Sequence, residues 1–126
     1  MDAQQETQFV NAFIAPNRRE RYVFMLSNSK RRQRLLDQLY HCRDIDPEVA
    51  KSPPSDECIV AHLRNLGAPD SCYVISTDAT HDGNCLPLET VFAEYVSGHA
   101  MLISCVPGVL GCFVDEYGSA TILRRK

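Results

Sequence analysis

The chain changes character near Pro69, with helix patterns before it and strand patterns after it. In the first half, apolar residues such as Phe9, Val10 and Phe13 recur at the spacing of one helix face. In the second half, short runs rich in β-branched and aromatic residues alternate with Gly- and Pro-containing turns. Helices and strands that are segregated along a chain are typical of α+β proteins. The pattern therefore predicts one α+β domain over residues 1–126, with a helical part at 1–68 and a sheet part at 69–126.

Four helices are expected in the first half. They are predicted around residues 9–14, at 17–26, at 30–42, and after a cap at Ser52 or Ser55 as far as Gly67. Ser27 and Ser29 offer hydroxyl oxygens that can cap the helix of residues 30–42. In the fourth helix, Asp56 and Glu57 suit the positive end of the helix dipole.

The second half predicts the order β-α-β-β-β. A strand at 71–76 is followed by a loop with an Asp82-Gly83 turn, and Pro87 then opens a helix that runs through Val96. Strands at 100–105, 110–116 and 120–125 follow, joined by short turns that favour antiparallel pairing. The expected fold is an N-terminal helical layer packed on a three- to four-stranded, mainly antiparallel sheet. Three terminal cations on the last strand suggest a protected sheet edge. The predicted core comprises Phe9, Phe13, Phe24, Leu36, Leu39, Ile59, Leu63, Val74, Val91, Phe92, Leu102, Ile103, Phe113, Val114, Ile122 and Leu123.

Positive charge is concentrated in one short stretch. Seven of the 13 Lys and Arg residues fall between Arg18 and Arg34, although the whole chain carries a net charge of -3. Cations in the first turn of a helix oppose its dipole unless an anion is bound there. The stretch therefore predicts an anion- or partner-binding surface made of Arg18, Arg19, Arg21, Ser29, Lys30, Arg31, Arg32 and Arg34. Its partner is expected to be an acidic protein face, a nucleic acid or a phosphorylated ligand.

Internal ion pairing is the alternative explanation of the basic stretch. Asp37, Asp44, Asp46 and Glu48 follow closely and could fold back onto the arginines. The pI of about 5.7 also argues against a nucleic-acid-binding role, because such domains are usually basic. The favoured function is a non-enzymatic binding or regulatory domain of the cytosol.

Catalysis by a cysteine is the second functional hypothesis. Cys85 precedes an expected helix, and His81 lies four residues upstream with Asp78 and Asp82 nearby to orient it. Cys105 with His99 forms a rival pair.

Metal and cofactor sites are not expected. His41, Cys42, Cys58 and His62 have zinc-binding side chains but lack the spacing of a zinc finger. No phosphate-loop, dinucleotide or metalloprotease motif is present. Cys72, Cys105 and Cys112 lie in apolar runs and are expected to be buried free thiols. The polar, acidic start of the chain and the absence of an apolar run of about 20 residues predict a cytoplasmic protein that does not enter a membrane.

Overall fold

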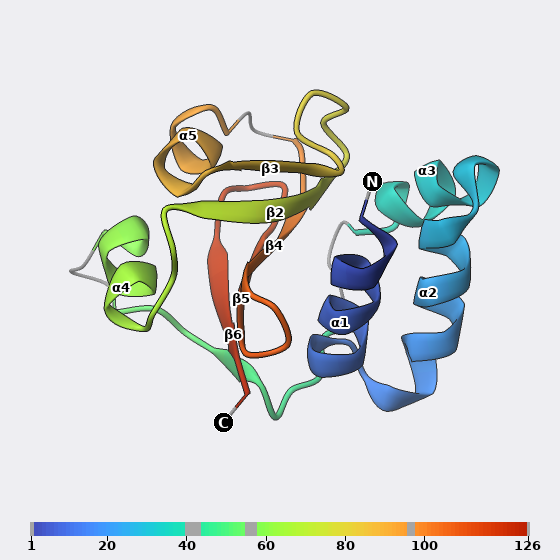
Figure 1. Cartoon of the computed structure of the whole chain (residues 1–126), viewed down its shortest axis with the longest axis horizontal. Coiled ribbons are helices and arrows are strands. Elements are labelled where there is room, and N and C mark those ends of the chain that lie inside the picture. Colours follow the sequence, from blue (N-terminus) through green and yellow to red (C-terminus); the bar gives the residue numbers. More distant parts are fainter. Residues whose placement is uncertain (1, 40–43, 55–57, 96–97, 126) are drawn as a thin grey trace.

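A six-stranded antiparallel sheet with helices on both faces forms the centre of the molecule (Figure 1). The computed structural model describes residues 2–39, 44–54, 58–95 and 98–125. The helices are α1 (Ala3–Phe13), α2 (Arg19–Ser27), α3 (Ser29–Asp37), α4 (Ile59–Asn65) and α5 (Leu88–Ala93), with a 3-10 turn at Pro16–Arg18. The strands are β1 (Ala50–Lys51), β2 (Ser71–Ser76), β3 (Asn84–Pro87), β4 (Met101–Val106), β5 (Leu110–Val114) and β6 (Ala120–Arg124).

The strand order across the sheet is β1-β6-β5-β4-β2-β3, and all neighbouring strands are antiparallel. The hairpins that join β4 to β5 and β5 to β6 turn at Gly108 and Gly118, whose φ angles are 74° and 87°. These positive φ values suit glycine, because a side chain would strain the backbone there. The α+β class is thus confirmed, together with the antiparallel pairing.

The number of strands was predicted too low. β1 lies between two predicted helices, where no strand was predicted, and β3 lies where the sequence predicted a loop and the start of a helix at Pro87. Both are short strands at the two edges of the sheet, where a strand needs a neighbour on one side only. Proline is tolerated at such an edge because the missing N–H group breaks no ladder hydrogen bond. β6 is therefore an inner strand, covered by β1, and the prediction that it forms an edge was wrong.

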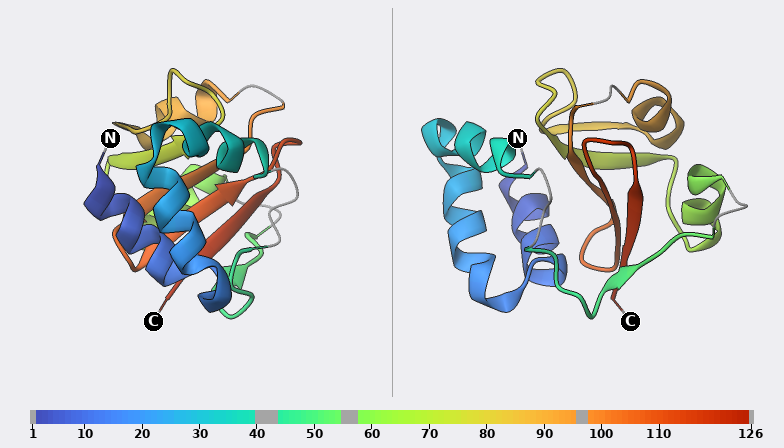
Figure 2. Two further views of the ribbon diagram at one scale, coloured as in Figure 1. Left: turned by 90° about the vertical axis from the view of Figure 1, so that its right-hand side faces the viewer. Right: turned by 180° about the vertical axis from the view of Figure 1, so that it is seen from behind.

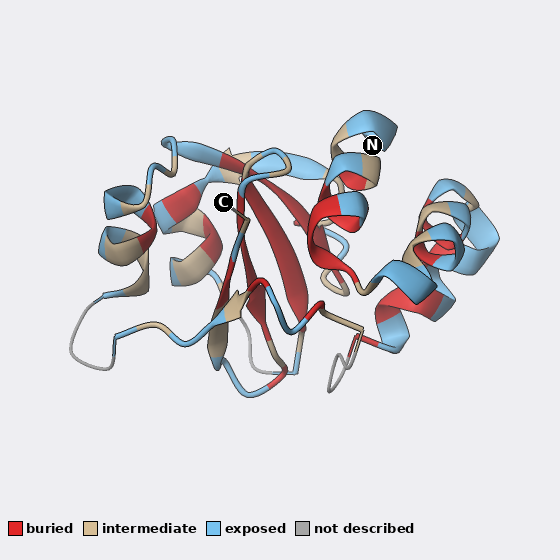
Figure 3. Ribbon diagram, turned by 90° about the horizontal axis from the view of Figure 1, so that it is seen from below, coloured by how far each residue is buried: buried red, intermediate tan, exposed pale blue. Residues whose placement is uncertain are grey.

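The two faces of the sheet bury separate apolar clusters (Figure 3). Along β2, Tyr73 and Ile75 face α1, whereas Cys72 and Val74 face α4 and α5. Covering both faces explains why β4 and β5 are almost entirely buried and show no alternation of polar residues. On one face of the sheet the helices form two tiers: α1 lies on the sheet, and α2 lies outside α1 (Figure 2).

The close approach of α1 to the sheet depends on a residue without a side chain. A Cβ atom added to Gly111 of β5 would lie 3.0 Å from Cε2 of Phe9 and 2.7 Å from the carbonyl oxygen of Ile103. Both distances are too short for ordinary packing. Gly111 thus lets the Phe9 ring rest on the sheet.

Several helices begin or end at other residues than predicted, and some have other capping residues. α1 begins earlier than predicted, because the Asp2 side chain accepts a hydrogen bond from the Gln5 N–H group at 3.1 Å. Asn28, and neither of the two serines beside it, caps α3. α3 ends at Asp37, before the predicted end at residue 42. α4 begins at Ile59 with Cys58 in the N-cap position and no side-chain cap, so Ser52 does not cap it as predicted. Ser55, Asp56 and Glu57 lie outside the described residues. α5 ends at Ala93, earlier than the predicted end at Val96, which is itself outside the described residues.

Most of the predicted core is buried, and Phe24 is the clear exception. Phe24 is 55% exposed, and it belongs to α2, which lies in the outer tier of helices (Figure 1). Ile59 of α4 and Phe92 of α5 are half-buried against the sheet.

Among the described residues, no helix has both the length and the apolar character needed to cross a membrane.

Candidate functional site

The structure divides the basic stretch into three groups with different surroundings. Arg32 is buried, with 5% of its surface exposed. Arg18 and Arg19 lie near acids of the following loop. The remaining cations lie on the outside of α2 and α3: Arg21, Lys30, Arg31 and Arg34. The eight predicted site residues therefore do not form one surface.

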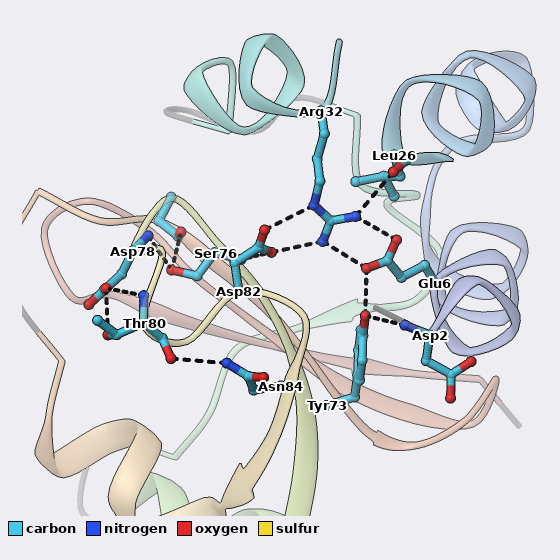
Figure 4. Close-up of polar contacts among 11 residues, drawn as sticks. Asp2, Glu6, Leu26, Arg32, Tyr73, Ser76, Asp78, Thr80, Asp82 and Asn84 are labelled. Carbon is cyan, nitrogen blue, oxygen red and sulfur yellow. Dashed lines mark hydrogen bonds and ion pairs between the residues drawn. The ribbon is translucent and has the colours of Figure 1, made fainter. Parts of the chain in front are cut away.

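Arg32 joins three segments of the chain through a buried ion-pair network (Figure 4). Its Nη1 and Nη2 atoms donate to the two carboxylate oxygens of Glu6 on α1, each at 2.7 Å. Its Nε and Nη2 atoms donate to the two carboxylate oxygens of Asp82 at 2.9 and 2.8 Å. Nη1 also donates to the carbonyl oxygen of Leu26 at 3.2 Å. These five bonds use the five N–H groups of the guanidinium.

The carboxylates of this network have further donors from the sheet. The Tyr73 hydroxyl of β2 donates to Glu6 at 2.6 Å, and the backbone N–H of Asp2 donates to the Tyr73 oxygen at 3.0 Å. The Ser76 N–H group donates to Asp82 at 3.1 Å. Burial raises the pKa of Tyr73 well above its ordinary value, and its bond to Glu6 adds to this effect. Burial alone would lower the pKa of Arg32, but the hydrogen bonds to Asp82 and Glu6 outweigh it and raise that pKa. Arg32 therefore stays charged inside the protein.

Arg18 and Arg19 are engaged by the acids that the sequence had suggested for internal pairing. Arg18 lies 3.6 Å from Asp44, and Arg19 lies 4.0 Å from Asp46. Arg19 also donates from Nε to the carbonyl oxygen of Ile14 at 2.9 Å. These two arginines thus hold the end of α1 and the loop after residue 43 together.

The start of α3 does not offer free N–H groups to an anion. The side-chain oxygen of Asn28 accepts from the N–H groups of Lys30 and Arg31 at 3.0 and 3.3 Å. The Ser27 hydroxyl donates to the carbonyl oxygen of Phe24 at 2.8 Å, and Ser29 is exposed in the first turn. The Asn28 cap therefore takes up donors that a phosphate group would need.

An exposed aromatic ring, Phe24, lies on the same two helices as the four outer cations. The guanidinium of Arg31 lies over the ring of Phe24, with its Cζ atom 5.5 Å from the ring centre. Arg21, one turn before Phe24 on α2, points Nε towards the sulfur of Met25 at 3.5 Å. Within the described ranges, none of the four outer cations contacts a carboxylate group. We call the group of Arg21, Phe24, Lys30, Arg31 and Arg34 the α2–α3 basic surface.

Cys85 and His81 are not brought together as a nucleophile and its base. The ring nitrogens of His81 lie 3.4 Å from Asp78 and 3.2 Å from Glu94, so both face carboxylates. Hydrogen bonding from Thr80 contributes most to a lowered pKa of Asp78. Cys85 is exposed on β3, and its sulfur lies 4.0 Å from the side-chain nitrogen of Gln5.

The rival pair, Cys105 and His99, is also separated. His99 contacts the Thr77 hydroxyl at 2.9 Å, and Cys105 is buried between the sheet and the α4–α5 layer. Burial raises the pKa of Cys105 to about 12, which keeps the thiol protonated at neutral pH. A protonated, enclosed thiol is a poor nucleophile.

The buried thiols lie on one side of the sheet, as small apolar side chains. Cys72, Cys105 and Cys112 belong to the cluster under α4 and α5, and burial raises the pKa of each. Cys58 is exposed and His62 is half-buried, whereas the other two residues of the possible zinc set, His41 and Cys42, lie outside the described residues. In the described ranges, no three His, Cys, Asp or Glu side chains are grouped so as to hold a metal ion.

Sequence reasoning missed Glu6 and Tyr73 as partners of Arg32. Glu6 occupies the same helix face as Phe9, Val10 and Phe13, so it is an acid within an apolar stripe. A buried acid needs a cationic or hydrogen-bonding partner. That position was therefore a signal for a buried ion pair, although its partner could not be identified before the fold was known.

Comparisons with known proteins give no relative to which the chain can be assigned. No family model matches the sequence, and no curated protein or solved structure matches it.

Proposed function

We propose that the protein is a non-enzymatic binding domain of the cytosol that recognises an acidic protein face through the α2–α3 basic surface. The observation that carries the proposal is the exposed Phe24 ring with the Arg31 guanidinium over it. Phe24, Val109 and Tyr117 are the large apolar side chains exposed among the described residues, and Phe24 is the one that has a cation over its ring.

The composition of this surface resembles the energetic centre of protein interfaces. Arginine and aromatic side chains are enriched among the residues that contribute most to binding. A guanidinium that lies on an aromatic ring keeps its N–H groups at the ring edge for carboxylate oxygens. Lys30 and Arg34 add charge on the neighbouring α3 surface without a carboxylate partner among the described residues.

An acidic protein fits the surface better than a nucleic acid does. The net charge of the chain is -3, so a long polyanion would be repelled outside the basic surface. The Asn28 cap also occupies N–H groups at the start of α3 that could otherwise bind phosphate. A protein partner needs only a local match of acidic and apolar groups.

The test is binding of a fluorescent peptide rich in Glu and containing one Leu or Phe, measured by anisotropy across a salt series. Single-stranded RNA is measured in parallel. Arg31→Glu/Arg34→Glu should weaken peptide binding by about tenfold or more. Lys51→Glu/Arg124→Glu makes the same change in net charge elsewhere on the surface and should retain most of the binding.

Two results would contradict this proposal. Equal losses in the two double variants would mean that only net charge matters, and RNA binding tighter than peptide binding would favour a nucleic acid as the partner. The Phe24→Ala variant adds a charge-neutral check, since it should also weaken binding of the peptide.

A further inference from the structure

A pocket lies against the Arg32 network, on the side of α3 away from the outer cations. Its volume is about 480 Å³, and it lies between the N-terminal turns of α1, the α2–α3 corner and the loop before β3. The walls are largely apolar, with Leu26, Leu36, Ala3 and Ala79 among them. Concave sites of this size with a few polar groups are typical of small-molecule binding.

The pocket is lined by more acidic than basic side chains. Glu6 and Asp82 supply two carboxylates, and Arg32 supplies one guanidinium. The side chains of all three are less than one-tenth exposed. Charge that is this little exposed is poorly screened by solvent. The local excess of one negative charge therefore favours a cation in the adjoining space.

The carboxylates also have acceptor capacity left. A carboxylate offers about four acceptor positions. Glu6 accepts three hydrogen bonds, from two N–H groups of Arg32 and from Tyr73. Asp82 likewise accepts three, from two N–H groups of Arg32 and from the Ser76 N–H group. One acceptor position remains on each side of the guanidinium, at Glu6 Oε1 and Asp82 Oδ2.

We infer that this pocket binds a small organic cation, an ammonium or guanidinium compound with an apolar body. The cationic head lies beside Glu6 and Asp82, and the apolar body contacts the leucine and alanine walls. The Arg32 guanidinium by itself would attract an anion, but its five N–H groups already donate to protein acceptors. An anion would therefore meet two carboxylates and no free donor of Arg32.

Three probes of nearly equal size test the charge preference: phenethylamine, 2-phenylethanol and 3-phenylpropionate. Isothermal titration calorimetry gives their affinities, and amide chemical shifts of the full chain locate the site. Phenethylamine should bind at least about tenfold more tightly than the alcohol, because charge-assisted hydrogen bonds are stronger than neutral ones. The carboxylate should not bind. Amide shifts should cluster around Glu6, residues 26–36 and Asp82.

Variants that fill the pocket with a larger side chain test whether phenethylamine binds there or elsewhere on the surface. Ala79 and Ala3 are exposed residues of the lining, so Ala79→Trp and Ala3→Trp should each abolish phenethylamine binding without removing a network residue. Ala93→Trp places the same side chain on α5 and should leave binding unchanged. Binding that survives both pocket variants, equal binding of the alcohol, or binding of the carboxylate would overturn the inference. The outcome is independent of the α2–α3 basic surface, whose residues none of these variants alters.

Discussion

Adjacent residues of α3 have opposite roles, and only the fold reveals which is which. Arg31 lies on the exposed Phe24 ring, and Arg32 enters the interior. The sequence presents both as members of one basic run, because the charge pattern says nothing about which side of the helix meets another element. Replacement of each by methionine gives a matched pair, since the two positions receive the same apolar side chain.

Arg32→Met should destabilise the fold by about 3–5 kcal/mol, because Glu6 and Asp82 would remain buried without a cationic partner. Arg31→Met should change the free energy of unfolding by less than about 0.5 kcal/mol, as is usual for an exposed residue. Urea denaturation followed by circular dichroism measures both. Equal losses in the two variants would show that the Arg32 network does not support the fold.

Gly111 and Ser104 face each other across β5 and β4, and their alanine variants should act in opposite directions. Gly111→Ala should destabilise the fold by about 1–3 kcal/mol, because the new Cβ has no space beside Phe9 and the Ile103 carbonyl oxygen. Ser104→Ala should be neutral or stabilising by up to about 1 kcal/mol. Its hydroxyl is buried without a hydrogen-bond partner in the described structure. Thermal unfolding of both variants checks this contrast, and a stable Gly111→Ala protein would refute the close packing of α1.

At the scale of the elements, the long periodic segments were predictable and the short edge strands were not. β2, β4, β5 and β6 carry enough β-branched and apolar residues for their pattern to identify them. β1 has two residues and β3 has four, too few for any alternation to be distinguished from a loop. Their pairing is set by the neighbours that they meet in the folded sheet.

The placement of α2 outside α1 explains why the core prediction failed at Phe24. A helix in the outer tier buries one narrow face, here through Tyr22, Met25 and Leu26. The sequence predicts the helix and its apolar content, but it cannot show that α1 separates this helix from the sheet. The same arrangement exposes the ring on which the proposed binding surface depends.

For the whole molecule, the buried thiols predict a loss of stability at alkaline pH. In the folded protein the pKa values of Cys72 and Cys105 are raised to about 12 from an ordinary value of 9.0. Above about pH 9 the unfolded chain loses these protons while the folded chain keeps them, so the unfolded state is favoured. Cys112 and Tyr73 are shifted in the same direction.

The free energy of unfolding should therefore fall steadily as the pH rises from about 9 towards 12. Urea titrations at a series of pH values measure this slope, with a reducing agent present to keep the thiols free. Cys105→Ala should make the slope shallower, whatever its effect on stability at pH 7. A slope that is the same in wild type and in this variant would mean that the Cys105 thiol does not contribute.

The Arg32 network also has a consequence for the order of folding. Arg32 is 26 residues from Glu6 and 50 residues from Asp82, so its bonds close two long loops at once. All three segments must already be in place before the guanidinium can meet both carboxylates. The network is therefore expected to form after the rate-limiting step, and Arg32→Met should mainly accelerate unfolding while the refolding rate changes little. Stopped-flow refolding and unfolding would show this as a shift confined to the unfolding limb, which makes Arg32 a determinant of how long the native protein lasts.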